Sequence, residues 1–201
     1  MKQLTFIILS VAFTEMISNA NAQTKAKTDS CYQGVYIAYE DFIKNQLSYK
    51  VKRKMKGTRF GFAFPTKTIR IVRPDTTVKF RTGSIYGYFD CGSFYRYSPD
   101  VELLSPEDYY KIEEMGGEEL GRLVIYTSVF MGGAEHFYSV RLNSPIHRLN
   151  INHLREDFEG PAPEFIKAVK KMTSENEGDI AAKDTKGNFL INKLYQQFVI
   201  R

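Results

Sequence analysis

Tryptophan is absent from this 201-residue sequence, and cysteine and histidine are scarce, with two and three residues. His136, His147 and His153 lack the paired spacing of metal ligands, and Cys31 and Cys91 lie far apart in the sequence. We therefore expect no metal and no cofactor. A metal site assembled from segments that are distant in the sequence is the alternative.

Sequence motifs of common enzymes are also missing. Gly83-Ser84-Ile85-Tyr86-Gly87 has its serine one position too early for a nucleophile elbow. The glycines from Gly116 to Gly121 are spaced like a phosphate-binding loop, but Arg122-Leu123 replaces its Lys-Ser/Thr step. We expect no catalytic residue from these patterns.

Long apolar runs are missing after the first 16 residues. Leu4–Met16 is mostly apolar and follows Lys2, but a membrane-spanning helix needs about 20 apolar residues. Ala20-Asn21-Ala22 then offers the small residues that signal peptidase binds. The sequence predicts a signal peptide over residues 1–22 and an exported mature chain without a transmembrane segment. An uncleaved anchor is the alternative, and the chain could reside in the periplasm, at the outer-membrane surface or outside the cell.

The aromatic content points to the fold class. Fifteen Phe and 13 Tyr, with many Val, Ile and Thr residues, favour strands over helices. Turn residues separate short strands predicted over residues 34–39, 68–72, 77–81, 84–89, 94–97, 109–112, 123–130 and 136–142. A short helix is predicted over residues 40–45, and the hairpin around Pro74 places Ile69, Ile71, Val78 and Phe80 on one buried face.

The C-terminal quarter changes to helical periodicity. We expect one helix capped by Asn150 or Asn152, another opened by Pro163, and a last one capped by Asn188. The expected buried stripes are Phe165, Val169 and Met172 in the second helix, and Leu190, Leu194 and Phe198 in the last.

Together these elements predict an α+β fold, with an antiparallel β-rich sheet or partly closed barrel and short C-terminal helices. Residues 23–172 would form a single domain, residues 173–187 a flexible linker, and residues 188–201 a helix packing on the same domain.

The two cysteines could form one disulfide in an oxidising compartment. A bond between Cys31 and Cys91 would stabilise the fold by about 4 kcal/mol, because it constrains a long loop of the unfolded chain. Two unpaired thiols are the alternative.

Positive charge is concentrated in one half of the chain. Residues 23–98 hold 15 Lys and Arg against 5 Asp and Glu, whereas residues 99–201 hold 12 against 17. Basic residues interleaved with aromatic ones can bind a polyanion or anionic lipid, and an ordinary solvated strand is the alternative. The candidate binding residues are Lys50, Lys52, Arg53, Lys54, Lys56, Arg59, Arg70, Lys79 and Arg81. In an exported protein we expect anionic lipid, polysaccharide or a protein as the partner, and not nucleic acid.

Acidic residues suggest a second hypothesis. Glu113-Glu114 and Glu118-Glu119 flank a short glycine-containing segment, which an exposed hairpin loop would explain. Paired carboxylates can also perform acid and base catalysis on sugars, so an envelope polysaccharide hydrolase using Glu113, Glu114 or Glu135 is the alternative to a non-enzymatic binding module.

The segments Gly34–Asn45, Ile85–Tyr88 and Phe94–Arg96 resemble small exported proteins of Bacteroidota that have no assigned activity. These positions are aromatic and glycine residues of structural character. The resemblance implies a fold relationship and export, and it supplies no catalytic residue.

Overall fold

The computed structural model describes residues 31–53, 59–63, 68–81, 83–99, 109–117, 120–130 and 133–200. The predicted signal peptide, Lys54 and Lys56 lie outside these ranges. The chain divides into two compact units, Met1–Tyr95 and Arg96–Arg201. We call them the first and the second unit.

Strands dominate the fold, and eight of them form an open antiparallel sheet in the order β11-β10-β9-β8-β7-β6-β1-β2, while β3-β4-β5 form a smaller sheet. The unit boundary falls within β7. This confirms the predicted α+β, β-rich fold class, with an antiparallel sheet rather than a partly closed barrel. The strands are β1 (Tyr32–Tyr36), β2 (Tyr49–Lys52), β3 (Arg59–Ala63), β4 (Thr68–Val72), β5 (Thr77–Arg81), β6 (Gly87–Asp90), β7 (Ser93–Tyr97), β8 (Tyr109–Glu114), β9 (Val124–Phe130), β10 (Gly133–Ser139) and β11 (His147–Arg148).

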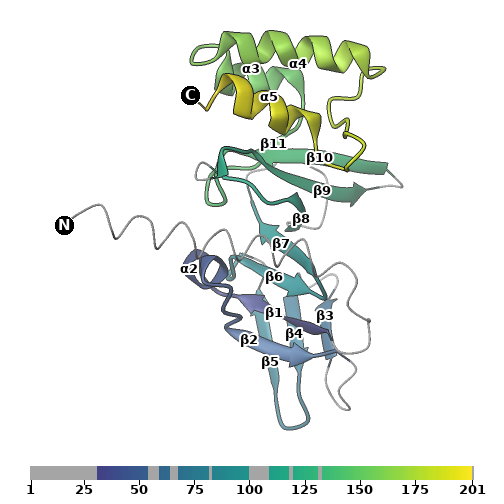
Figure 1. Cartoon of the computed structure of the whole chain (residues 1–201). Helices are drawn as coiled ribbons and strands as arrows, with labels where there is room; N and C mark the ends of the chain where they lie inside the picture. Colours follow the sequence, from purple (N-terminus) through teal and green to yellow (C-terminus); the bar gives the residue numbers. More distant parts are fainter. Residues whose placement is uncertain are drawn as a thin grey trace, which may run out of the picture. The chain divides into compact units, whose positions relative to one another are not determined.

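The first unit holds the three-stranded sheet, strands β1, β2 and β6 of the larger sheet, and the short helix α2 (Tyr39–Ile43). The coil of α2 is drawn in purple in Figure 1. The predicted hairpin is confirmed, since Ile69 pairs with Phe80 and Ile71 pairs with Val78 in the β4–β5 ladder. Ile69 and Ile71 are buried, because alternate residues of a strand share one face.

A disulfide joins Cys31 and Cys91, which are 60 residues apart in the sequence and have Cα atoms 5.0 Å apart. It ties the start of β1 to the turn between β6 and β7. Cys91 has a φ of +48° and is followed by Gly92 with a φ of +99°, so the turn uses the left-handed conformation that glycine adopts readily.

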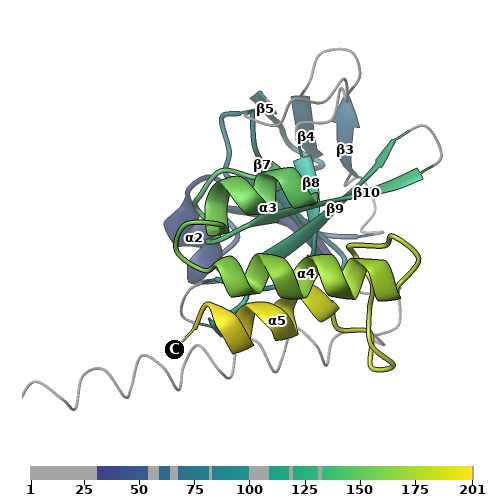
Figure 2. The ribbon, with the colours of Figure 1, turned by 90° about the horizontal axis from the view of Figure 1, so that it is seen from above.

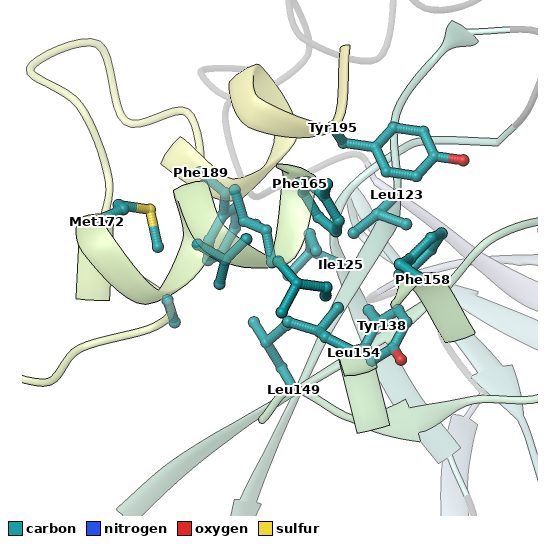
Figure 3. Close-up of a cluster of buried hydrophobic side chains, with 14 of the residues drawn as sticks. Leu123, Ile125, Tyr138, Leu149, Leu154, Phe158, Phe165, Met172, Phe189 and Tyr195 are labelled. Atoms are coloured by element: carbon teal, nitrogen blue, oxygen red, sulfur yellow. The ribbon is translucent and has the colours of Figure 1, made fainter. Parts of the chain in front are cut away.

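The second unit stacks three helices on one face of its strands, as Figures 1 and 2 show: α3 (Ile151–Phe158), α4 (Pro163–Glu175) and α5 (Leu190–Phe198). The Asn150 side chain accepts a hydrogen bond from the His153 amide, which confirms the predicted cap. Pro163 opens α4, whose residues Phe165, Val169 and Met172 are buried as expected. These side chains meet Leu123, Ile125 and Tyr138 of the sheet in one contiguous core (Figure 3).

The expectations for α5 are wrong in two respects. Its N-cap is Phe189 rather than Asn188, because Asn188 is hydrogen-bonded to Asp184 instead. Its fully buried residues are Ile191, Asn192 and Tyr195, while the predicted stripe of Leu190, Leu194 and Phe198 is only partly buried beside the core.

The segment expected to be a linker is organised by its own hydrogen bonds. Helix α4 continues to Glu175, Ala181 and Ala182 are buried, and Asp184 accepts hydrogen bonds from the amides of Lys186 and Asn188. These bonds explain why a polar segment without periodicity follows a defined path. No helix in the described part of the chain is long and apolar enough to cross a membrane.

Candidate functional site

The described basic residues divide between two surfaces of the first unit. Tyr49 of β2 contacts Phe80 of β5, with ring centroids 5.1 Å apart, so these two side chains lie between the sheets. Lys50 and Lys52 alternate with Tyr49 and Val51 and therefore point to the opposite face of β2. Lys50 and Lys52 therefore lie on a different surface from Arg70, Lys79 and Arg81, because β2 pairs with β1 and belongs to the other sheet.

The first surface is the outer face of the β4–β5 hairpin. Arg70 and Lys79 are direct cross-strand partners, and Arg81 lies diagonally from Arg70 on the same face. All three side chains are exposed, and none forms an ion pair with a described residue. We call Arg70, Lys79 and Arg81 the cation cluster. Arg59 joins this ladder through its backbone pairing with Val72.

The second surface is the face of β1, β2 and β6 that bears α2. Strand register places Tyr32, Gly34 and Tyr36 of β1 on this face, together with Lys50 and Phe89. Phe42 of α2 contacts the rings of Tyr36 and Phe94 at centroid distances of 5.3 and 5.6 Å. The helix therefore fixes the aromatic side chains that rise from the strands.

A hollow of about 350 Å³ opens on this second surface. We call it the aromatic hollow, and its lining residues are Cys31, Tyr32, Tyr36, Asn45, Leu47, Lys50, Phe89, Cys91, Gly92 and Phe94. Its volume lies in the range of small-molecule sites, and its walls combine apolar rings with a few polar groups, as such sites do.

Two nitrogen donors line the aromatic hollow. The Lys50 ammonium lies 3.8 Å from the centroid of the Tyr32 ring, a cation–π contact. Asn45, with a φ of +50°, accepts a hydrogen bond of 3.0 Å from the Tyr36 hydroxyl. Burial raises the pKa of Tyr36 far above the ordinary tyrosine value, so the hydroxyl keeps the proton that it donates to Asn45.

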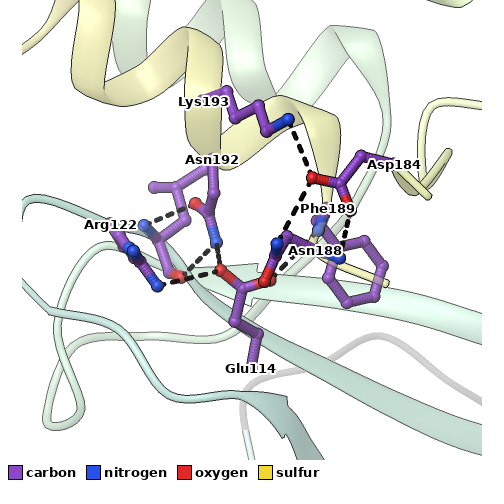
Figure 4. A network of polar contacts seen from close by, with 8 residues as sticks. Glu114, Arg122, Asp184, Asn188, Phe189, Asn192 and Lys193 are labelled. Carbon is purple, nitrogen blue, oxygen red and sulfur yellow. Dashed lines mark hydrogen bonds and ion pairs between the residues drawn. The ribbon is translucent and has the colours of Figure 1, made fainter. Parts of the chain in front are cut away.

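Glu114 is a structural residue rather than part of an exposed loop. Its carboxylate accepts hydrogen bonds from the Phe189 amide at 3.1 Å and from the Asn192 side chain at 2.9 Å (Figure 4). Asn192 also bonds the backbone N–H and C=O of Leu123, at 2.8 and 3.0 Å. These bonds attach the start of α5 to the sheet.

The other two glutamates of the hydrolase hypothesis also have cationic partners. Glu113 binds Lys111 at 2.7 Å, and Glu135 binds Arg148. None of the three glutamates lines the hollow described above or the smaller hollow described below. Each of the three carboxylates therefore has at least one side-chain partner in the described chain.

A smaller hollow of about 340 Å³ in the second unit brings Ser144, His147 and Asp157 together with three apolar residues. The Ser144 hydroxyl is hydrogen-bonded to the backbone of Arg141, and Asp157 accepts from the Tyr138 hydroxyl at 2.6 Å. Within the described residues no hydrogen bond connects Ser144, His147 and Asp157, so they do not form a nucleophilic triad. Among the residues that the structure describes, no three His, Cys, Asp or Glu side chains are placed to hold a metal.

The aromatic hollow contains functional candidates that sequence reasoning did not select, above all Asn45, Tyr36 and Phe94. Their grouping depends on which strands are neighbours, and the sequence carries no direct signal for that. Lys50 is the one predicted binding residue that lines it. Comparisons of the chain with protein-family models, curated proteins and solved structures give no match.

Proposed function

We propose that this chain is an exported, non-enzymatic module that binds phosphate groups of an anionic envelope component through the cation cluster. The observation that carries the proposal is the direct opposition of Arg70 and Lys79 across the β4–β5 ladder. Like charges in this position destabilise a sheet unless an anion compensates them. A bound phosphate would remove that cost.

The chemistry of the surface fits phosphate better than an isolated carboxylate. An arginine guanidinium can donate two parallel hydrogen bonds to one phosphate group, and a lysine ammonium contributes a compact positive charge. The cation cluster contains two arginines and one lysine. Thr77 lies on the same face of the hairpin, where its hydroxyl group adds a further donor. The face belongs to a sheet rather than a cleft, which suits the surface of a membrane or a polymer.

Export is supported by the N-terminal sequence pattern and by the disulfide. Structural disulfides persist in oxidising compartments such as the periplasm and the cell exterior. There, phosphate is displayed by lipid headgroups and by phosphorylated polysaccharide, which are the two sources that the experiment must distinguish.

The test is sedimentation with vesicles of phosphatidylglycerol and phosphatidylcholine across a series of salt concentrations. We expect retention at low salt that falls as salt rises, because screening weakens exposed charge interactions. The variant R70Q/K79Q/R81Q should lose at least about tenfold in retention, which corresponds to 1.4 kcal/mol. A matched variant, K167Q/K170Q/K171Q, removes the same charge from exposed positions of α4 and should behave as the original protein.

A second arm uses phosphorylated and dephosphorylated lipopolysaccharide. Preference for the phosphorylated form, with weak binding to vesicles, would assign the polysaccharide as the source. Equal losses in the two triple variants, or binding indifferent to phosphate, would refute the proposal.

A further inference from the structure

We infer that the aromatic hollow is a separate binding site for a small molecule that carries a flat apolar body and one anionic group. This site is independent of the proposed function. Tyr49 of β2 faces Phe80 of the small sheet, whereas the aromatic hollow lies on the opposite face of β1 and β2. The inference rests on the walls, the donors and the distribution of acidic groups.

The walls of the aromatic hollow provide ring faces and edges for a flat ligand. Phe89 and Phe94 have centroids 4.9 Å apart, and Tyr36 stacks beside Phe94 at 6.4 Å. Tyr32 stands at the rim, where it is 44% exposed and is one of three large hydrophobic residues of the described chain with such exposure. An aromatic ligand would cover this ring and gain the preferred stacked or edge-to-face geometry.

The donors of the aromatic hollow select for negative charge. The Lys50 ammonium is held at the Tyr32 ring, and the Asn45 amide nitrogen makes no hydrogen bond to a described residue while its oxygen is bound by Tyr36. An anionic oxygen placed between them would accept from both nitrogens. Such charge-assisted bonds are the stronger class of hydrogen bond.

None of the described residues that line the aromatic hollow carries a carboxylate that could compete for these donors. Two nearby acidic residues have other partners, since Asp41 accepts from Ser48 at 2.7 Å and Asp90 accepts from Gln33 at 2.7 Å. Gln33 and Asp90 pair on the strand face opposite to Gly34 and Phe89. The charge that faces the ligand is therefore positive.

The aromatic hollow is preformed by covalent and backbone constraints. The Cys31–Cys91 disulfide forms part of its wall. At Gly34, a Cβ atom would lie 2.1 Å from the Tyr49 carbonyl oxygen, so only glycine allows the close approach of β1 to the segment that carries Leu47 and Lys50. A site whose walls are fixed before binding loses less conformational entropy on binding.

The test is calorimetric titration of the full mature chain with 2-naphthalenesulfonate and, separately, with the neutral 2-naphthalenemethanol. We expect the sulfonate to bind at least about tenfold more tightly than the neutral compound. Lys50 and Asn45 can donate hydrogen bonds to the sulfonate group, which the neutral compound lacks. The variant K50Q should abolish this preference and leave the affinity for the neutral compound unchanged.

Two control variants keep the inference falsifiable. Lys52 lies on the same face of β2 as Lys50 but does not line the aromatic hollow. The variant K52Q should therefore retain the preference for the sulfonate. Y32A changes a rim side chain, so it should leave the circular dichroism spectrum unchanged and weaken both compounds, the sulfonate more because Lys50 loses its contact with the ring. Equal affinity for the two compounds, binding of neither, or loss of sulfonate binding in R70Q/K79Q/R81Q would overturn the inference.

Discussion

Several charged and amide side chains of the second unit bind partners across long stretches of sequence, whereas Arg70, Lys79 and Arg81 of the first unit form no ion pair with a described residue. In the second unit, Arg96 is buried and donates to the Tyr126 hydroxyl at 2.9 Å and to the Ser144 carbonyl oxygen at 2.6 Å. Glu114 accepts hydrogen bonds from the Phe189 amide and the Asn192 side chain, and Asn192 also donates to the Leu123 carbonyl oxygen. In the first unit, Arg70 and Lys79 oppose each other on the exposed face of a hairpin.

The source of stability differs in the same way. Helices α3 to α5 and the sheet of the second unit share one apolar core, which includes Leu154, Phe165 and Ile191. The first unit has one five-residue helix and a disulfide. The second unit therefore depends mainly on its apolar core, whereas the first unit depends more on its disulfide.

The largest expected effect is confined to the first unit. Replacing both cysteines in C31S/C91S should lower its free energy of unfolding by about 4 kcal/mol, because the unfolded chain regains the entropy of a 60-residue loop. Hydrogen exchange measured by mass spectrometry should show faster exchange in residues 32–52 and 83–95. Peptides from α4 should exchange as before, and an equal loss of protection there would contradict the distinction between the units.

An intermediate effect is expected in the second unit. E114Q replaces an acceptor that is bound by the Phe189 amide and the Asn192 side chain, and it presents an NH₂ donor to one of these donors. We expect chemical denaturation to show a loss of about 2 kcal/mol. E113Q is the matched control at the adjacent residue, whose pairing with Lys111 is at the surface and should contribute little. Similar stability of the two variants would show that the Glu114 network does not hold α5.

The smallest effect has the opposite sign. K79Q removes one member of the like-charged cross-strand pair and should stabilise the first unit by about 0.5 kcal/mol at low ionic strength. The gain should shrink as salt rises, because the two charges are exposed. K167Q removes a lysine that pairs with Glu164 on α4, and it should be neutral or slightly destabilising in the same thermal unfolding measurement. If K79Q were destabilising, the cation cluster would contribute to folding and would not be a cost.

Local sequence signals predicted much of the fold. Pro74 and the alternation on either side of it identified the β4–β5 hairpin with its buried face, and Pro163 with its apolar stripe identified α4. The α5 face was misread because Asn192, a polar residue, is buried by hydrogen bonds to Leu123, which lies 69 residues away. The periodicity of apolar residues along a helix cannot predict such a long-range hydrogen bond.

The candidate sites depended even more on long-range pairing. Lys50 and Arg70 appeared to belong to one basic surface, but β2 pairs with β1 while β4 pairs with β3 and β5. The aromatic hollow joins β1 to a turn some 60 residues later through the disulfide. Residue type identified Lys50 as a candidate, and only strand order showed what surrounds it.

The attachment of α5 sets an order of events during synthesis. Both cysteines and every strand that borders the aromatic hollow lie within the first 97 residues, so the first unit has its pairing partners early. The attachment of the last helix must instead wait for Phe189 and Asn192, which bind Glu114 across separations of 75 and 78 residues. A nascent chain that stops before the last helix would therefore expose the face of β8 and β9 on which that helix rests.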